Sequence, residues 1–228
     1  MVYSPQGQAG MSSEDRVVGV FRAILGSMAG QGDTVMDKRA VYTIGHSNHE
    51  IDAFIGLLKR HGVTALADVR SRPHSRFKQF RKKELERALA EAGIAYVFLG
   101  RELGGKRDEP ECYVDGEKDY ARIARLPIFQ EGLKRLDDLA REHTVALMCA
   151  EREPLDCHRT ILICRELRGG PFRILHILAD GGIEEHEETE RRLLSVTGME
   201  DDLFAQRLSR EERIARAYTL RARQLAAG

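Results

Sequence analysis

The sequence predicts an α/β protein, a single domain with a mostly parallel sheet flanked by helices and followed by a helical C-terminal extension. Short apolar runs of strand length alternate along the chain with stretches in which apolar residues recur at helical spacing. Strands that are apolar throughout are typical of a parallel sheet covered by helices on both faces. With 228 residues, 42% of them hydrophobic, the chain is long enough for one such domain with additions.

The regular pattern begins near Ala40. In chain order we expect a strand at 41–44, a helix over 51–58, a strand at 63–69, a helix over 85–92 and a strand at 94–99. The first helix has apolar residues at i, i+3, i+4 and i+7 and ends at Gly62, and either Ser47 or Asn48 is expected to cap it. The second helix ends at Gly93.

The second half continues the alternation after a glycine-rich, charged loop over 100–116. Two helical stretches meet at Pro127 and precede a strand at 144–149. A helix over 157–168 is closed by Gly169 and Gly170, and a fifth strand follows at 172–178.

Three segments follow from this pattern. Residues 1–37 form a flexible or loosely helical N-terminal arm, with one short amphipathic stretch over 17–25, and residues 38–183 form the α/β domain. Residues 184–228 are charged and helical in pattern. They are either a solvated helical tail packed on the domain or an oligomerisation element.

Composition excludes several classes of protein. The 36 basic and 36 acidic residues cancel, which excludes a uniformly basic nucleic-acid coat and leaves only local patches for polyanions. A mean hydropathy of -0.40 with 32% charged residues leaves no apolar run of membrane-spanning length, so no membrane partner is expected. Four cysteines are too few for a disulfide scaffold, and no export signal is evident, so we expect a cytoplasmic protein with free thiols.

Ligands of an open parallel sheet bind beyond the carboxyl ends of its strands, so the loops after the strands are the expected site. Four of these loops are rich in chemically active side chains, which we expect to meet at one edge of the sheet. The candidates are His46 and Ser47 after the first strand, Asp68, Arg70, Ser75 and Arg76 after the second, Gly104 and Gly105 after the third, and Cys149, Glu151, Cys157, His158 and Arg159 after the fourth.

Within this set, the carboxyl groups of Asp68 and Glu151 are candidates for a general base or for stabilising positive charge at a sugar carbon. His46 and His158 are their candidate acid and base partners, although a loop histidine is often only hydrogen-bonded. Cys157 stands where a helix begins, which favours a thiolate. The alternative for Cys157 is a small packed core residue. The remaining candidates are expected to bind the ligand, with Arg70, Arg76 and Arg159 as an anion clamp.

Residues 70–83 form the most basic segment, with seven arginines and lysines, no acidic residue, and Phe77 and Phe80 between the charges. Guanidinium groups suit phosphate oxygens and aromatic rings stack on bases, so the segment is suited to a nucleotide or a nucleic-acid strand. The alternative is a solvated basic turn before the next helix.

Cofactor motifs are missing from the sequence. Gly100 to Lys106 nearly spells a phosphate-binding P-loop, but Arg107 stands where a Ser or Thr must bind Mg²⁺. No dinucleotide fingerprint, hydrolase elbow or zincin motif is present. Metal-ligand side chains are available, but without a C-x-x-C pair a metal site is not favoured, and the cofactor stays unassigned.

The ordered motifs resemble the DUF488 family of uncharacterised bacterial and archaeal proteins over roughly residues 40–180. The matching segments are Thr43-Ile44-Gly45-His46-Ser47, Asp68-Val69-Arg70-Ser71-Arg72-Pro73-His74-Ser75-Arg76, Leu103-Gly104-Gly105, and Cys149-Ala150-Glu151 with Pro154 and Cys157-His158-Arg159. The resemblance implies an α/β domain whose four loops form one site. It implies no reaction.

The leading functional hypothesis is an enzyme that hydrolyses a glycosidic or phosphoester bond in a phosphate-containing nucleotide or nucleic acid. A non-catalytic nucleic-acid-binding or regulatory module is the alternative, which uses the same arginines without Glu151 or Cys157. Thiol chemistry at Cys157 is a third hypothesis.

Overall fold

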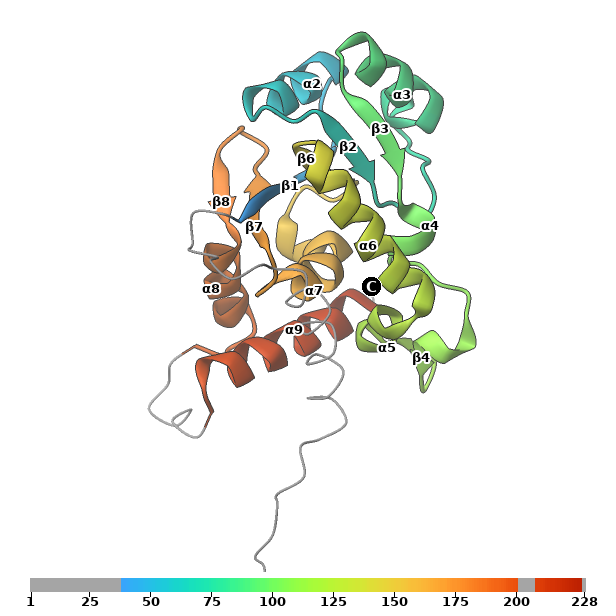
Figure 1. Cartoon of the computed structure of the whole chain (residues 1–228). Helices are drawn as coiled ribbons and strands as arrows, with labels where there is room; N and C mark the ends of the chain where they lie inside the picture. Colours follow the sequence, from blue (N-terminus) through green and yellow to red (C-terminus); the bar gives the residue numbers. More distant parts are fainter. Residues whose placement is uncertain (1–37, 201–207, 227–228) are drawn as a thin grey trace, which may run out of the picture.

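The computed structural model describes residues 38–200 and 208–226. A six-stranded sheet has the order β3-β2-β6-β1-β7-β8. Its strands are β1 (Arg39–Gly45), β2 (Ala65–Asp68), β3 (Ala95–Phe98), β6 (Val145–Cys149), β7 (Phe172–Ile177) and β8 (Ile183–Glu185). Neighbouring strands are parallel except for β7 and β8. The predicted α/β class with a mostly parallel sheet is therefore confirmed (Figure 1).

Helices connect these strands. They are α2 (Ile51–Arg60), α3 (Lys82–Glu91), α4 (Gly100–Leu103), α5 (Tyr120–Arg125), α6 (Pro127–Glu142), α7 (Arg165–Leu167), α8 (His186–Val196) and α9 (Arg210–Ala226). Short 3₁₀ turns occur at η2 (Lys78–Phe80), η3 (Pro110–Cys112) and η4 (Pro154–Asp156), and η5 (Arg159–Cys164) is a π-helix that runs into α7. A two-stranded hairpin, β4 (Tyr113–Val114) and β5 (Glu117–Lys118), lies between η3 and α5.

Successive side chains of a strand point to opposite faces of the sheet, and this produces two apolar cores, one on each face. Leu66 of β2 and Met148 of β6 belong to the core under α2 and α3. Ala67 and Leu147, their neighbours in sequence, belong to the core shared with α5 to α9. Figure 1 shows the same division, with α2 and α3 above the sheet and α6, α7, α8 and α9 below it. Because both faces are covered, an exposed site is left mainly to the ends of the strands.

Some local predictions need correction. The helix α2 is preceded by Glu50 in the capping position, with no side-chain hydrogen bond; neither Ser47 nor Asn48 caps it. Ser47 instead has a positive φ of 46° in the turn after β1. The loop over 100–116 contains α4 and part of a hairpin, and the short edge strand β8 was not predicted. The amphipathic stretch over 17–25 lies outside the described residues.

The helices α8 and α9 pack into the core of the α/β unit. Leu193 of α8 and Ile214, Ala217 and Tyr218 of α9 share one buried cluster with residues of β1, β2 and β6. Both helices therefore contribute to the apolar core. The segment boundaries at 38, 183 and 184 stay predictions. Among the helices of the described ranges, none is long and apolar enough to cross a membrane.

Candidate functional site

The loops after β1 and β6 lie against each other. Gly45 at the end of β1 pairs with Cys149 at the end of β6. Beyond the strands, the His46 amide donates to the Cys149 carbonyl at 2.8 Å and the Ser47 amide to the Ala150 carbonyl at 3.0 Å. A Cβ atom on Gly45 would lie 1.9 Å from the Glu151 carbonyl oxygen. Only glycine permits this approach, so the Gly45 position is set by loop packing.

The centre of the site is a cluster that we call the thiol cluster: Cys149, Glu151, Cys157 and His158. One ligand-type atom from each residue lies within 4.8 Å of the others. His158 Nδ1 is 3.6 Å from Cys149 Sγ and 3.9 Å from Cys157 Sγ. The Cys157 thiol contacts the Glu151 carboxylate at 3.1 Å. Residues eight positions apart in sequence thus meet because η4 turns the chain back toward the end of β6.

Contacts from two other loops hold the His158 ring. Its Nε2 lies 3.0 Å from the carbonyl oxygen of Val69, directly after β2. A carbonyl only accepts hydrogen bonds, so Nε2 carries the proton in this contact. The ring also lies against Gly105, where a Cβ atom would be 2.8 Å from the His158 side chain. The loops after β2 and β3 therefore orient a histidine of the loop after β6.

Cys157 is buried and its pKa is shifted. Burial alone would raise the pKa of the thiol, but hydrogen bonding from Cys149 and the positive charges of Arg159 and His158 lower it well below its ordinary value. The Arg159 amide also points at the sulfur, 3.4 Å away. Burial and contact with Cys157 raise the pKa of Cys149. Of the two thiols, the site thus favours a proton on Cys149 over a proton on Cys157.

The Arg159 side chain is completely buried. Its guanidinium group donates to the Glu151 carbonyl at 2.6 Å and the Arg152 carbonyl at 3.2 Å, and its Nε lies 3.4 Å from Thr43 Oγ1. Arg159 therefore holds the loop after β6 in place and places a positive charge behind the thiols.

Glu151 is exposed as a residue, while its carboxyl group lies against the thiol of Cys157. Desolvation there, followed by the charge of Cys157, raises the pKa of the carboxyl. The charges of the thiol cluster also act on Tyr120 of α5. Burial, and then the charges of Cys157 and Glu151, raise the pKa of its phenol. Sequence patterns gave no signal for Tyr120, because one tyrosine at a helix start resembles any core residue.

A second group beside the cluster is fully paired internally. Asp68 accepts two hydrogen bonds from the Arg70 guanidinium, at 2.9 and 2.6 Å, one from the Arg70 amide at 3.1 Å and one from Tyr96 at 2.8 Å. Arg70 also donates to the Phe80 carbonyl at 2.8 Å. Asp68 is 0% and Arg70 5% exposed. Asp68 and Arg70 thus stabilise the conformation of the loop after β2. The sequence does not predict Tyr96 as a partner of Asp68.

The remaining candidates lie around this centre. His46 stacks on Phe80 with ring centroids 4.3 Å apart, and its Nδ1 lies 2.9 Å from the Ser47 carbonyl. Burial is the main reason why the pKa of His46 falls to about 4. Ser75 accepts a hydrogen bond from the Phe77 amide, and the exposed Arg76 lies over the Phe77 ring at 4.8 Å.

Gly104 packs against Ser71, where a Cβ atom would be 2.3 Å from the hydroxyl oxygen. The structure thus brings together Cys149, Glu151, Cys157, His158, Arg159 and Gly105. In the described ranges, Ser75 and Arg76 form no hydrogen bond or ion pair with the thiol cluster. The expectation that both Phe77 and Phe80 are available to stack on bases needs correction, because Phe80 is a core residue with no exposed surface.

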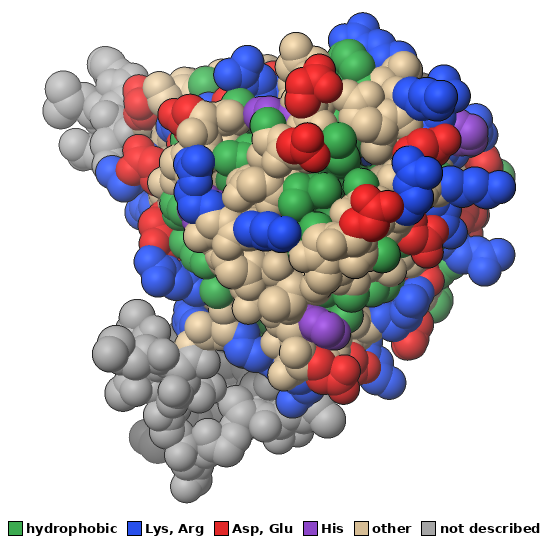
Figure 2. Space-filling view, turned by 90° about the horizontal axis from the view of Figure 1, so that it is seen from above, with side chains coloured by type: hydrophobic (Ala, Val, Ile, Leu, Met, Phe, Trp, Pro, Cys, Tyr) green, Lys and Arg blue, Asp and Glu red, His purple; other side chains and the backbone are tan. Residues whose placement is uncertain are grey.

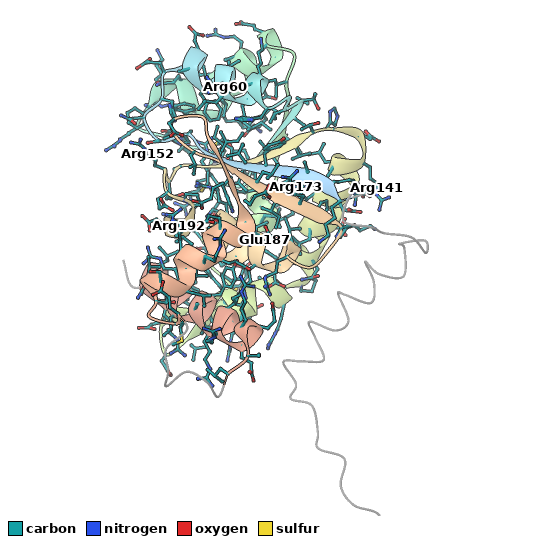
Figure 3. All side chains as sticks on the ribbon, turned by 90° about the vertical axis from the view of Figure 1, so that its left-hand side faces the viewer. Arg60, Arg141, Arg152, Arg173, Glu187 and Arg192 are labelled. Atoms are coloured by element: carbon teal, nitrogen blue, oxygen red, sulfur yellow. The ribbon has the colours of Figure 1, made fainter. Side chains whose placement is uncertain are left out.

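The helix α8 supports the loop after β6 from outside. Arg192 donates to the Glu153 carboxylate at 2.6 Å and to Glu184 at 2.8 Å. Figure 3 shows Arg192 on α8, with Arg152 further toward α2 along the same side of the molecule. Because Glu153 precedes η4, this bridge fixes the turn that brings Cys157 back to Cys149.

One protein-family model matches this chain. The family model described as "Domain of unknown function DUF488" matches residues 50–165. The match includes the second, third and fourth site loops and the whole thiol cluster. Searches of curated proteins and of solved structures returned no match. The matched region covers more than half of the chain, and the chain therefore belongs to the DUF488 family.

Proposed function

We propose that this protein is a hydrolase that acts on a phosphate-containing nucleotide or nucleic acid, with Glu151 as its general acid and base. The single observation that carries the proposal is the position of Glu151. It is an exposed residue, and its carboxylate lies 3.1 Å from the buried Cys157 thiol, at the strand ends where four loops meet. A carboxylate held at such an edge is positioned to reach both solvent water and a bound substrate.

The proposed reaction needs only water and the substrate. Glu151 accepts a proton from water while the water oxygen forms a bond to phosphorus or to the anomeric carbon. The bond to the leaving group breaks, and the leaving group receives the proton from Glu151. The oxygen and both protons of water thus appear in the two products.

The substrate class rests on the basic segment. Arg72, Arg76, Lys78, Arg81, Lys82 and Lys83 are exposed, and within the described part of the chain none of them forms an ion pair. Figure 2, which looks down on the side of α2 and α3, shows arginine and lysine side chains gathered at the right-hand rim, where α3 lies, with acidic side chains among them. Unpaired surface cations favour a polyanionic ligand.

The basic segment is attached to the site at both ends. Ser71, at its start, accepts a hydrogen bond from the Lys106 amide at 2.9 Å. Further along, Gln79 donates to the His49 carbonyl at 3.0 Å, and Phe80 stacks on His46. We therefore assign anion binding to the exposed cations, since the guanidinium groups of Arg70 and Arg159 are engaged within the protein.

His46 supplies a further polar contact at the same edge. Its Nδ1 faces the Ser47 carbonyl, and its Nε2 is buried without a hydrogen-bond partner among the described residues. A buried acceptor of this kind is suited to a substrate hydroxyl or to an ordered water.

The experiment measures phosphate and nucleobase release from nucleotides and from single-stranded oligonucleotides. We expect turnover by the full-length protein, a loss of at least about 100-fold in Glu151→Gln with substrate binding retained, and no change in Glu142→Gln, an exposed glutamate at the end of α6. Turnover that survives Glu151→Gln contradicts the proposal. If the wild type binds oligonucleotides without turnover, the protein is instead a non-catalytic nucleic-acid-binding module. The unpaired surface cations support that alternative by themselves.

A further inference from the structure

We propose that Cys149, Cys157 and His158 bind a divalent transition metal ion of the Zn²⁺ class, with Glu151 beside the fourth coordination position. The donors come from the end of β6 and from the turn before η5. Two thiolates and one imidazole are a ligand set that Zn²⁺ uses where a fourth position stays open. Metal binding stands independently of the proposed hydrolysis, whereas the role of Glu151 beside the metal rests on it.

The donor distances fit one ion. With Zn–S and Zn–N bonds of about 2.3 and 2.0–2.1 Å, a tetrahedral angle separates the two donor atoms by about 3.6 Å. His158 Nδ1 lies 3.6 Å from Cys149 Sγ and 3.9 Å from Cys157 Sγ. Both S···N edges of the required triangle are therefore present already, within a few tenths of an ångström.

The histidine presents the correct nitrogen. Nε2 of His158 donates its proton to the Val69 carbonyl, so Nδ1 is the nitrogen directed at the two sulfur atoms. Its lone pair is free for a metal once a bound ion has displaced any proton there. Metal-binding histidines usually fix their tautomer by such a contact of the second nitrogen. Gly105 packs behind the ring and limits its rotation.

Hydrogen bonding and charge around the sulfur atoms also fit a metal thiolate. The Arg159 amide lies 3.4 Å from Cys157 Sγ, a contact that stabilises a thiolate ligand. Two thiolates neutralise a dication, and the remaining pair of charges, Glu151 and Arg159, has opposite signs. The site therefore accepts a dication without leaving a net buried charge.

The other group of potential ligands does not meet these conditions. Cys164, His176 and His186 are all buried and close together. Both nitrogens of His176 are engaged, with Thr43 at 2.8 Å and with His186 at 3.0 Å, and the second nitrogen of His186 faces the Tyr218 hydroxyl at 2.9 Å. A metal there would have to break this hydrogen-bonded chain.

A metal in the thiol cluster would supply Lewis acidity, which lowers the pKa of a bound water to near neutrality. The Glu151 carboxylate is 3.1 Å from Cys157 Sγ and within 4.8 Å of the ligand atoms of Cys149 and His158. It is therefore placed to accept the proton of a water in the fourth position. This arrangement deepens the proposed hydrolysis by naming the group that activates its water.

The test uses full-length protein that has been stripped of metal by a chelator and is then titrated with Co²⁺. We expect one equivalent to bind, with a sulfur-to-cobalt charge-transfer band and the intense visible bands of a tetrahedral ion, and Zn²⁺ to displace it. Cys157→Ser and His158→Gln should each weaken Co²⁺ binding by at least about 10-fold, and Cys157→Ser should reduce the charge-transfer band.

Cys112→Ser is the matched control, because Cys112 is also a buried free thiol but lies in η3, outside the thiol cluster. It should leave the titration unchanged. Absence of a sulfur-to-cobalt band in the wild type, or a band of full intensity in Cys157→Ser, overturns the metal site, and the wild-type result decides the matter even if a variant fails to fold. Two measurements on the wild type, the Co²⁺ titration and the hydrolysis assay, separate the two proposals. Stoichiometric Co²⁺ binding without any hydrolysis retains the metal site and rejects the proposed function.

Discussion

The Val69 carbonyl oxygen and the Nε2 atom of His158 lie 3.0 Å apart and join the loop after β2 to the loop after β6. This contact fixes the proton on Nε2 and turns Nδ1 toward Cys149 and Cys157. One backbone carbonyl thus determines which atom of the histidine faces the thiols. Residues 89 positions apart in sequence form one centre because their strands end at the same edge of the sheet.

Gly105 should be intolerant of a side chain. In Gly105→Ala the new Cβ atom would lie 2.8 Å from the His158 ring, so the ring or the loop must move, at a cost of about 1–3 kcal/mol in the free energy of unfolding. Chemical denaturation measures this loss. Gly56→Ala is the control, since beyond its chain neighbours and the backbone of its own helix no atom lies within 4 Å of its Cβ position in α2. It should stabilise the protein by about 0.5–1 kcal/mol, and equal effects at the two glycines would contradict the packing role of Gly105.

The buried pair of Asp68 and Arg70 should matter for stability. Asp68→Asn removes the negative charge that two nitrogens of Arg70 contact and leaves a guanidinium group buried with fewer partners. We expect the free energy of unfolding to fall by about 3–5 kcal/mol. The exposed pair of Arg87 and Glu91 is the comparison, at 3.8 Å and 77% and 73% exposed. Glu91→Gln should change stability by less than about 0.5 kcal/mol, and a similarly small effect of Asp68→Asn would refute the stabilising role of the buried pair.

The sequence predicts the buried strands of the sheet but not its exposed edge strand. The strands around Ile44 and Leu147 were predicted because apolar runs record burial on both faces of a sheet. The edge strand β8 was missed because its residues, Ile183 to Glu185, are exposed or half-buried and lack that signal. The sequence also predicts that the loops after the strands lie at one edge of the sheet, because parallel strands end at the same edge.

The partners of buried polar groups were not predictable. The Asp68-x-Arg70 spacing is compatible with an open anion clamp, and only the conformation after β2 shows the guanidinium folded back on the carboxylate. The sequence does not favour a metal site, because it contains no C-x-x-C pair and does not show that the separate candidate ligands converge. The η4 turn, which brings Cys149 and Cys157 together, has no strong sequence signature.

Acid should destabilise the protein through His186 and His176. Burial lowers the pKa of His186 to about 4 and that of His176 well below its ordinary value. The groups facing His186 are His176, Tyr218, Glu190 and Arg168. Below about pH 6.5 the unfolded chain therefore binds more protons at these histidines than the folded chain does. The contribution of the neutral histidines to the free energy of unfolding is complete above about pH 6.5 and is lost as the pH falls toward 4.

Thermal unfolding between pH 7 and pH 4 measures this dependence. His186→Gln should flatten the acid limb of the stability curve even if it lowers the maximum. His74→Gln, which alters an exposed side chain, should leave the shape of the curve unchanged. An acid limb of the same slope in His186→Gln would remove His186 from the explanation.

Neutralising the basic segment should weaken oligonucleotide binding without altering stability. Arg72→Gln and Arg76→Gln each remove an exposed charge that has no acidic partner in the described ranges. We expect the logarithmic salt dependence of binding to fall by about 0.7 per lost phosphate contact for a single strand. Fluorescence anisotropy with a labelled oligonucleotide measures it. Arg216→Gln on α9 is the control, and an equal loss there would mean that binding does not involve the segment.

The most direct measurement is X-ray absorption at the zinc edge on the full-length, zinc-loaded protein. Our account predicts one ion per chain with two sulfur donors at about 2.3 Å and nitrogen and oxygen donors at about 2.0–2.1 Å, and a loss of one sulfur in Cys157→Ser. A coordination shell of nitrogen and oxygen alone, or a protein that retains no stoichiometric zinc, would contradict the thiol cluster as the centre of this site.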